Sequence, residues 1–107
     1  MPLQNMQDLH LALEKSNEQL VLVFKHSTRC HISAVALRNF EADWHDKGIL
    51  PFYLDLIAHR DISNQIAADM YVEHQSPQLI LIKNKKAIYH SSHSDIDFGA
   101  VVAQSNN

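Results

Sequence analysis

The sequence is poor in cysteine, in glycine and in excess positive charge. One cysteine among 107 residues excludes a disulfide within the chain, and two glycines are too few for a glycine-rich phosphate-binding loop. Nine Lys and Arg against twelve Asp and Glu leave a net charge of −3 with neutral histidines, which argues against binding nucleic acid or anionic membranes through bulk charge. The longest apolar runs, 20–24 and 79–82, are far shorter than the ~20 residues of a membrane-spanning helix. We therefore expect neither nucleic acid nor membrane among the partners.

The length and the apolar fraction predict one domain. A chain of 107 residues with 46% apolar residues can bury a core without disulfide or metal staples, so we expect a single domain over residues 1–107. Residues 1–5 lack the basic region and the apolar core of a signal peptide, which favours a cytoplasmic location. We expect a monomer or a weak dimer.

Hydrophobic periodicity and turn residues predict the element order α-β-α-β-α-β-β-α. The first helix follows Asn5, a suitable N-cap residue, and the run 20–24 has the non-alternating pattern of a strand buried on both faces. The other predicted elements are a helix over 30–44 after a polar turn at 25–29, a strand over 50–57, a helix capped by Asp61, strands over 78–83 and 86–91 joined by Asn84-Lys85, and a last helix capped by Ser94 with Asp97 three residues on.

This order predicts an α/β fold with a mixed sheet. The strands at 20–24 and 50–57 flank a helix and form a parallel βαβ unit, whereas the short connection at Asn84-Lys85 makes the last two strands an antiparallel hairpin. A parallel half followed by a hairpin half, with helices covering the sheet, is the thioredoxin-like arrangement. The sheet would have four strands, or five if residues 2–4 add a short one.

The single cysteine lies where a strand passes into a helix. Cys30 stands in the first turn of the helix over 30–44, with Ser27 or Thr28 available as its N-cap. Free backbone N–H groups and the positive end of the helix dipole favour a thiolate at such a position. Between residues 20 and 40 there is no acidic side chain. The basic and imidazole side chains of that stretch are Lys25, His26, Arg29, His31 and Arg38. We therefore expect the pKa of the Cys30 thiol to lie below the ~8.5 of free cysteine.

A lone cysteine is more often a small buried core residue, and this alternative has to be weighed. Its neighbours Arg29 and His31 are poor core residues. The apolar stripe of the helix passes through Leu37, Phe40 and Trp44 and extends back to Ser33, which excludes Cys30 from the buried face. We therefore favour a reactive thiol near the surface.

Residues 25–33 read Lys-His-Ser-Thr-Arg-Cys-His-Ile-Ser and resemble the active-site segment of the monothiol bacilliredoxin family, the YtxJ-like general stress proteins, whose motif runs Thr-Cys-Pro-Ile-Ser. Matches in the same order continue along nearly the whole chain. They are Ser63 with Ile66-Ala67, His74 to Gln78, and Ser92-His93 with Ile96. Arg29 and His31 depart from the family's Thr and Pro, and both add potential positive charge that could activate the thiol.

The resemblance implies a thioredoxin fold whose nucleophile is Cys30 and which carries Ser33 where a resolving cysteine usually stands. The implied function is a monothiol thiol-disulfide oxidoreductase, which removes a low-molecular-weight thiol from S-thiolated proteins. By family the thiol is bacillithiol, and another small thiol would take its place in a host that lacks it. This thiol is a co-substrate, and no bound cofactor is expected. Independently of the family, a chain with one cysteine needs an outside thiol to resolve any mixed disulfide.

The dipeptide Ser76-Pro77 matches the place where thioredoxin-like proteins carry a cis-proline facing the active-site cysteine. Cis is a minority state for an X–Pro bond, so the residues alone favour a trans proline at the start of a strand, and the resemblance reverses that preference. We expect Ser76 and Pro77 to take part in substrate binding, together with Thr28, Arg29, His31 and Ser33 around the nucleophile.

A metal site and a non-catalytic function are the two alternatives to this prediction. The eight histidines include His90 and His93 at a spacing of three, but no His-Glu-x-x-His motif or paired cysteines accompany them, so we predict no metal site. His74 and His93 match family positions and could shape the cleft. The alternative function is a non-catalytic thioredoxin-like binding module in a stress response, which would hold partner chains at Ser76-Pro77 without turnover.

Overall fold

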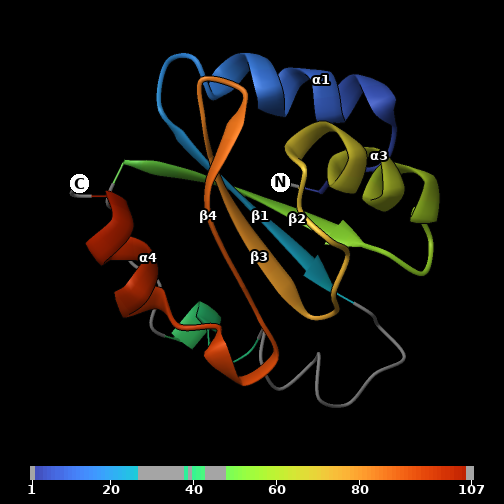
Figure 1. The fold of residues 1–107 in the computed structure, drawn as a ribbon. Coiled ribbons are helices and arrows are strands. Elements are labelled where there is room, and N and C mark those ends of the chain that lie inside the picture. Colours follow the sequence, from blue (N-terminus) through green and yellow to red (C-terminus); the bar gives the residue numbers. More distant parts are fainter. Residues whose placement is uncertain (1, 27–37, 39, 43–47, 106–107) are drawn as a thin grey trace.

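The structure, a computed structural model, describes residues 2–26, 38, 40–42 and 48–105. Its elements are α1 (Met6–Lys15), β1 (Leu20–His26), β2 (Ile49–Asp55), α3 (Arg60–Met70), β3 (Gln78–Lys83), β4 (Lys86–Ser92), the short 3₁₀ helix η1 (His93–Asp95) and α4 (Phe98–Ser105) (Figure 1). Residues 38 and 40–42 are also helical and lie within the predicted helix over 30–44. In this described part, no helix combines the length and the apolar character needed to cross a bilayer.

The four strands form one mixed sheet in the order β2-β1-β3-β4. β1 pairs in parallel with β2 and antiparallel with β3, and β3 pairs antiparallel with β4. β1 is therefore a central strand, as its non-alternating sequence predicts. The α/β class with a thioredoxin-like mixed sheet is confirmed. Residues near the N-terminus add an isolated parallel bridge between Pro2 and Tyr53 but no fifth strand.

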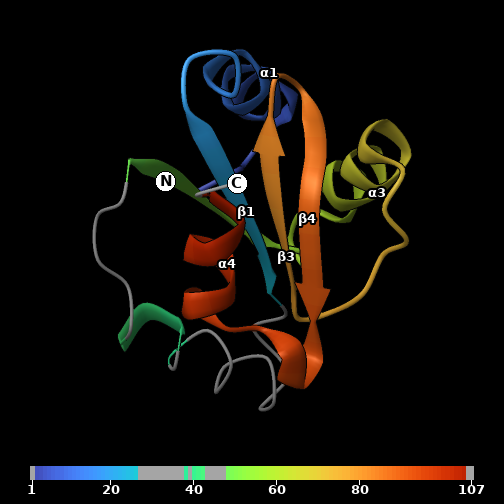
Figure 2. The same cartoon turned by 60° about the vertical axis from the view of Figure 1, so that its left-hand side comes forward.

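Helices cover both faces of the sheet. Figures 1 and 2 show α1 and α3 on one face, and α4 with the helical residues near 40 on the other. Alternate residues of β1 enter two separate cores, because successive side chains of a strand point to opposite faces. Val21 and Val23 pack in the core on the α1 and α3 face, whereas Leu22 and Phe24 pack in the core on the α4 face.

The turn between β3 and β4 is bound to the end of α1. Asn84 and Lys85 both have positive φ, 52° and 63°, which is typical of the two-residue turn whose twist matches a hairpin. The Asn84 N–H donates to the Ser16 carbonyl at 2.8 Å, and the Lys85 N–H donates to Ser16 Oγ at 2.9 Å. The predicted tight turn is confirmed.

The start of α3 differs from the prediction. Its N-cap is His59, whose side chain makes no capping bond, and Asp61 lies inside the first turn. Asp61 was therefore wrongly predicted as the cap. A carboxylate in the first turn still interacts favourably with the helix dipole, so the same residue preference appears at either position.

The start of α4 also differs. Ser94 falls in η1, and Asp97 is the residue that caps α4, because its Oδ2 accepts a hydrogen bond from the Ala100 N–H at 3.0 Å. The prediction of Ser94 as the cap was wrong by three residues. The 3₁₀ turn at η1 precedes the helix, and the backbone N–H of its first residue, His93, donates to the Pro77 carbonyl at 3.0 Å.

Tyr71 ends α3 in an unfavourable conformation and allows a test of the fold. It has φ 56° in the left-handed region, and 95% of its surface is exposed. Glycine adopts this conformation without steric cost, so we expect Tyr71→Gly to raise the free energy of unfolding by about 0.5–1 kcal/mol. Urea titration would measure this, with Tyr71→Phe as an unchanged control. A loss of stability in Tyr71→Gly would show that the exposed ring contributes to the fold.

Candidate active site

The carboxyl end of β1 leads directly to the segment that holds the cysteine. The predicted site residues Thr28, Arg29, Cys30, His31 and Ser33 lie outside the described residues. What the structure places is the surrounding framework: the last residues of β1, the loop between α3 and β3, and η1. The site is therefore built from these flanking elements.

The structure brings Ser76-Pro77 next to the end of β1. Lys25 of β1 pairs with Gln78 of β3, so Pro77 lies one residue beyond the last paired position. The Ser76–Pro77 peptide bond is cis, as the resemblance implies, and Pro77 is buried. Together with the bond between the His93 N–H and the Pro77 carbonyl, this places β1, Ser76-Pro77 and η1 at one end of the sheet.

Two serine hydroxyls near this end are buried and have no hydrogen-bond partner among the residues that the structure describes. They are Ser76 Oγ and Ser91 Oγ. Ser91 lies in β4 opposite Leu79 of β3. Leu79 follows Pro77 by two residues in the sequence. A buried hydroxyl without a partner costs free energy, and sites that receive a ligand are one setting in which such groups occur. Ser76 stays a predicted substrate-binding residue.

β1 continues two residues further than predicted, which changes the position of Lys25 and His26. Both were expected in a polar turn, but both are buried strand residues, and Lys25 has no exposed surface. His26 packs its ring against that of Tyr53 with centroids 5.4 Å apart. The Leu56 N–H donates to the His26 carbonyl at 2.9 Å. Tertiary partners therefore keep these polar residues in the sheet.

Lys25 is the centre of a buried polar cluster that the sequence does not reveal. Its Nζ donates to the Ser63 carbonyl at 3.1 Å and lies 3.4 Å from His74 Nδ1, which is also 3.1 Å from Ser63 Oγ. Burial lowers the pKa of Lys25 from 10.5 to about 8. Burial, together with the charges of Lys25 and Arg60, lowers the pKa of His74 below 6.5. The sequence contains two partial signals: residues 21, 23 and 25 share one strand face, and Ser63 and His74 match family positions.

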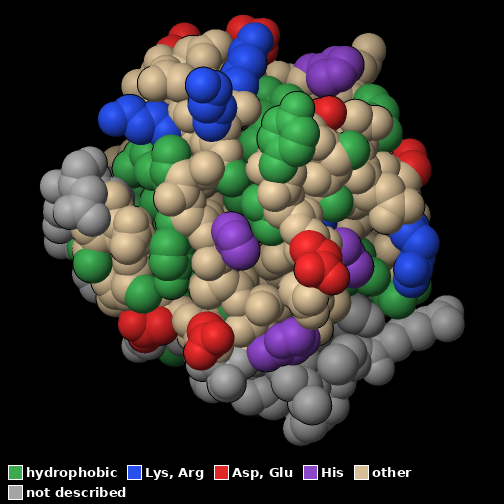
Figure 3. All heavy atoms as spheres, viewed as in Figure 1, with side chains coloured by type: hydrophobic (Ala, Val, Ile, Leu, Met, Phe, Trp, Pro, Cys, Tyr) green, Lys and Arg blue, Asp and Glu red, His purple; other side chains and the backbone are tan. Residues whose placement is uncertain are grey.

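The histidines do not gather into a metal centre in the part of the chain that is described. No group of three His, Cys, Asp or Glu side chains there is arranged to hold a metal ion. Figure 3 shows histidine side chains spread over one face of the molecule rather than clustered. His90 projects from β4 and is exposed, and His93 is exposed in η1.

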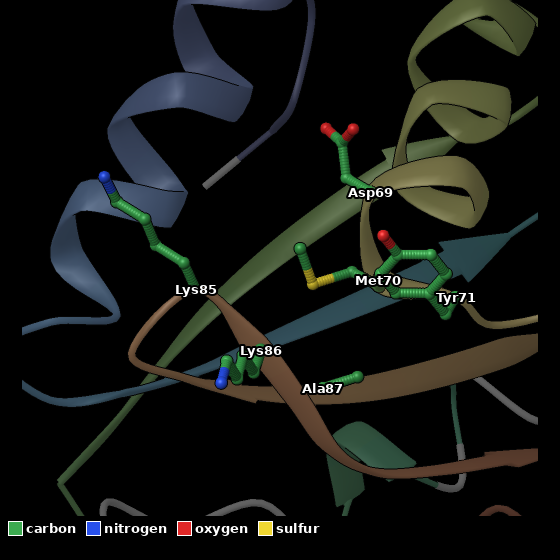
Figure 4. A pocket seen from close by; sticks show the side chains of 6 residues that line it. All are labelled: Asp69, Met70, Tyr71, Lys85, Lys86 and Ala87. Atoms are coloured by element: carbon green, nitrogen blue, oxygen red, sulfur yellow. The ribbon is translucent and has the colours of Figure 1, made fainter.

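A pocket of about 390 Å³ lies away from this site. Its lining comes from the end of α3 and the β3–β4 turn: Asp69, Met70, Tyr71, Lys85, Lys86 and Ala87 (Figure 4). In the antiparallel register, Ile82 is paired with Val21 near the start of β1, while Gln78 is paired with Lys25 near its end. The pocket therefore lies at the opposite end of the sheet from Ser76-Pro77.

Comparison with solved structures defines the class of protein. A candidate oxidoreductase with a thioredoxin fold superposes with a TM-score of 0.85 at 28% identity, over 97% of this chain and 91% of that one. Schistosoma mansoni thioredoxin gives a TM-score of 0.76 at 19% identity over 99% and 92% of the two chains. Malassezia sympodialis thioredoxin gives 0.78 at 12% identity over 99% and 90%. The protein has a thioredoxin-like oxidoreductase fold.

A match to a family model classifies the protein more closely than the shared fold does. The family model of the monothiol bacilliredoxin BrxC matches residues 1–101. The chain belongs to the monothiol bacilliredoxin family, as the resemblance around Cys30 indicates.

Proposed function

We propose that this protein is a monothiol thiol-disulfide oxidoreductase that removes a low-molecular-weight thiol from protein mixed disulfides through Cys30. The observation that carries the proposal is that a chain of this family and fold contains a single cysteine. Bacillithiol is the thiol that the family suggests. A reactive thiol that depends on small thiols suits the reducing cytoplasm, where we expect the protein to act as a monomer or weak dimer.

The reaction balances with two thiol exchanges. The Cys30 thiolate attacks the sulfur of the small thiol in the mixed disulfide, so a Cys30–small-thiol disulfide forms and the client's cysteine leaves as a thiolate. A second small-thiol thiolate then attacks the sulfur of the bound small thiol, which regenerates Cys30 and releases a symmetrical small-thiol disulfide. No net oxidant is needed, because one disulfide is converted into another.

Substrate binding in this proposal depends on Ser76 and Pro77, with Thr28, Arg29, His31 and Ser33 around the nucleophile. Support comes from the position of Ser76-Pro77 at the end of β1, the strand that leads into the cysteine segment. An extended client segment could pair with the backbone of Ser76 as an added strand.

The test is a turnover assay on a client protein with one S-thiolated cysteine. Released client thiol is measured by mass spectrometry, with bacillithiol or glutathione as the modifying and the regenerating thiol. We expect release with multiple turnovers and a rate that depends on the regenerating thiol. If no release occurs with either thiol while Cys30→Ser still binds the same clients, the protein is a binding module and the proposal is wrong.

A further inference from the structure

The cluster of Lys25, Ser63 and His74 connects β1 and α3 to the loop that carries Ser76-Pro77. Lys25 is near the end of β1, Ser63 is in α3, and His74 is in the loop 71–77, two residues before Ser76. All the contacts lie on the α3 face of the sheet, next to buried Ile62 and Ile66. The proposed thiol exchange does not use this cluster, so its role needs a separate explanation.

The ammonium group of Lys25 favours one protonation pattern of the His74 ring. An ammonium group has three donors and no acceptor, so Nδ1 of His74 can only accept from Lys25 Nζ at 3.4 Å. Ser63 Oγ, 3.1 Å from the same nitrogen, must then donate as well. A neutral imidazole that accepts at Nδ1 carries its proton on Nε2. A cationic ring would turn an N–H toward the ammonium group and is disfavoured.

Within the described part of the chain, no carboxylate forms an ion pair with Lys25. The two residues that pair with Lys25 in the neighbouring strands are uncharged: Leu54 in β2 and Gln78 in β3. The titratable and charged groups on α3, on the residue before it and on the following loop are His59, Arg60, Asp61, Asp69, Tyr71, Glu73 and His74. Of these, His59 and His74 are half-buried and the others are exposed. A buried cation without a carboxylate costs stability, which points to a role other than stabilisation.

The same loop is held by a second buried side chain. Gln78 Nε2 donates to the Glu73 carbonyl at 3.0 Å, and Gln78 Oε1 accepts from the Gln75 N–H at 3.4 Å. Gln78 is the strand partner of Lys25, so two adjacent buried side chains fix residues 73–75. Lys25 differs from Gln78 in that it contacts an imidazole, whose protonation pattern it can select.

We propose that Lys25 is a positioning residue for the loop 71–77, and that it holds His74 as the neutral tautomer with its proton on Nε2. The half-buried ring then presents a hydrogen-bond donor three residues before Pro77, where it can meet a carbonyl or carboxylate oxygen of the thiolated client. The role of the loop in client binding rests on the proposed function, whereas the tautomer does not.

The first experiment measures the tautomer itself, by ¹⁵N–¹H correlation spectra of the histidine rings in the full chain. In the native protein we expect an unprotonated Nδ1 and a protonated Nε2 for His74 at pH 7. In Lys25→Met we expect a mixture of tautomers and a rise in the pKa of His74, because the neighbouring cation is gone. Lys83→Met, which removes an exposed lysine from β3, should change neither. A native His74 protonated on Nδ1 at pH 7, or a Lys25→Met spectrum like the native one, would overturn the inference.

The second experiment measures client turnover. We expect Lys25→Met and His74→Phe each to raise the KM for an S-thiolated client about tenfold with a smaller change in kcat, and the double variant to add no further loss. Independent, multiplicative losses would contradict the inference, because the two residues would then act separately. If the native protein has no turnover, the proposed function fails, while the ring spectra still decide the tautomer.

Discussion

Cys30→Ser is expected to lower the rate of client release by on the order of 10³-fold or more. A serine hydroxyl is far less acidic than a thiol and cannot form the disulfide intermediate, and the chain has no second cysteine to replace it. The turnover assay with an S-thiolated client measures this loss, and urea unfolding of Cys30→Ser checks that the variant is folded.

Two further variants sharpen this prediction. Ser33→Ala should lose less than about tenfold, because a hydroxyl can position a substrate but cannot resolve a disulfide. Lys86→Met, which changes an exposed residue of the pocket at the opposite end of the sheet, should keep native activity. Equal losses in Cys30→Ser and Ser33→Ala would contradict a mechanism that depends on one thiol.

Lys25→Met is expected to make the protein more stable at pH 7. The folded-state pKa of about 8 against the ordinary 10.5 means that burial of the charged amine costs about 3 kcal/mol, at ~1.4 kcal/mol per pH unit. The variant avoids this cost but loses the hydrogen bonds to Ser63 and His74, each worth about 1 kcal/mol. We therefore expect a net gain of about 1–2 kcal/mol in the free energy of unfolding.

The difference in stability between the native protein and Lys25→Met should depend on pH. Between pH 8 and 10.5 the unfolded chain keeps the Lys25 proton while the folded chain releases it, so the native protein gains stability as pH rises. Lys25→Met lacks this gain, and its advantage should decline by about 3 kcal/mol between pH 7 and pH 11. Urea unfolding over this range measures it, with the exposed Lys83→Met as matched control. A difference that does not change with pH would show that Lys25 is not buried as a charged group.

The fold could be predicted from the sequence because its signals are local. The run 20–24, the spacing of Ile62, Ile66 and Met70, and the turn at Asn84-Lys85 each depend on neighbours within a few residues. The boundaries that were wrong depend on contacts distant in sequence. Lys25 reads as a turn residue by its polarity. Its strand partners Leu54 and Gln78, and its side-chain contacts Ser63 and His74, are all distant from it in sequence.

For the candidate site, too, some features could be predicted from the sequence and others could not. The cis peptide at Ser76-Pro77 could be anticipated only through the family resemblance, since the residues alone favour trans. His74 stood out as a family-matched residue, but its partner could not be identified, because an ammonium group buried without a carboxylate contradicts the usual preference of lysine for the surface. The caps at His59 and Asp97 show a related limit, since several polar residues near a helix start have similar preferences.

The most direct test of the central claim is the mass of the reaction intermediate. The reduced protein is mixed with an S-thiolated client, quenched with acid before a regenerating thiol is added, and digested for mass spectrometry. We predict one small thiol in disulfide linkage on the peptide that contains Cys30, together with an equal amount of free client thiol. A disulfide between Cys30 and the client itself, or an unmodified Cys30 beside an intact client, would contradict the account.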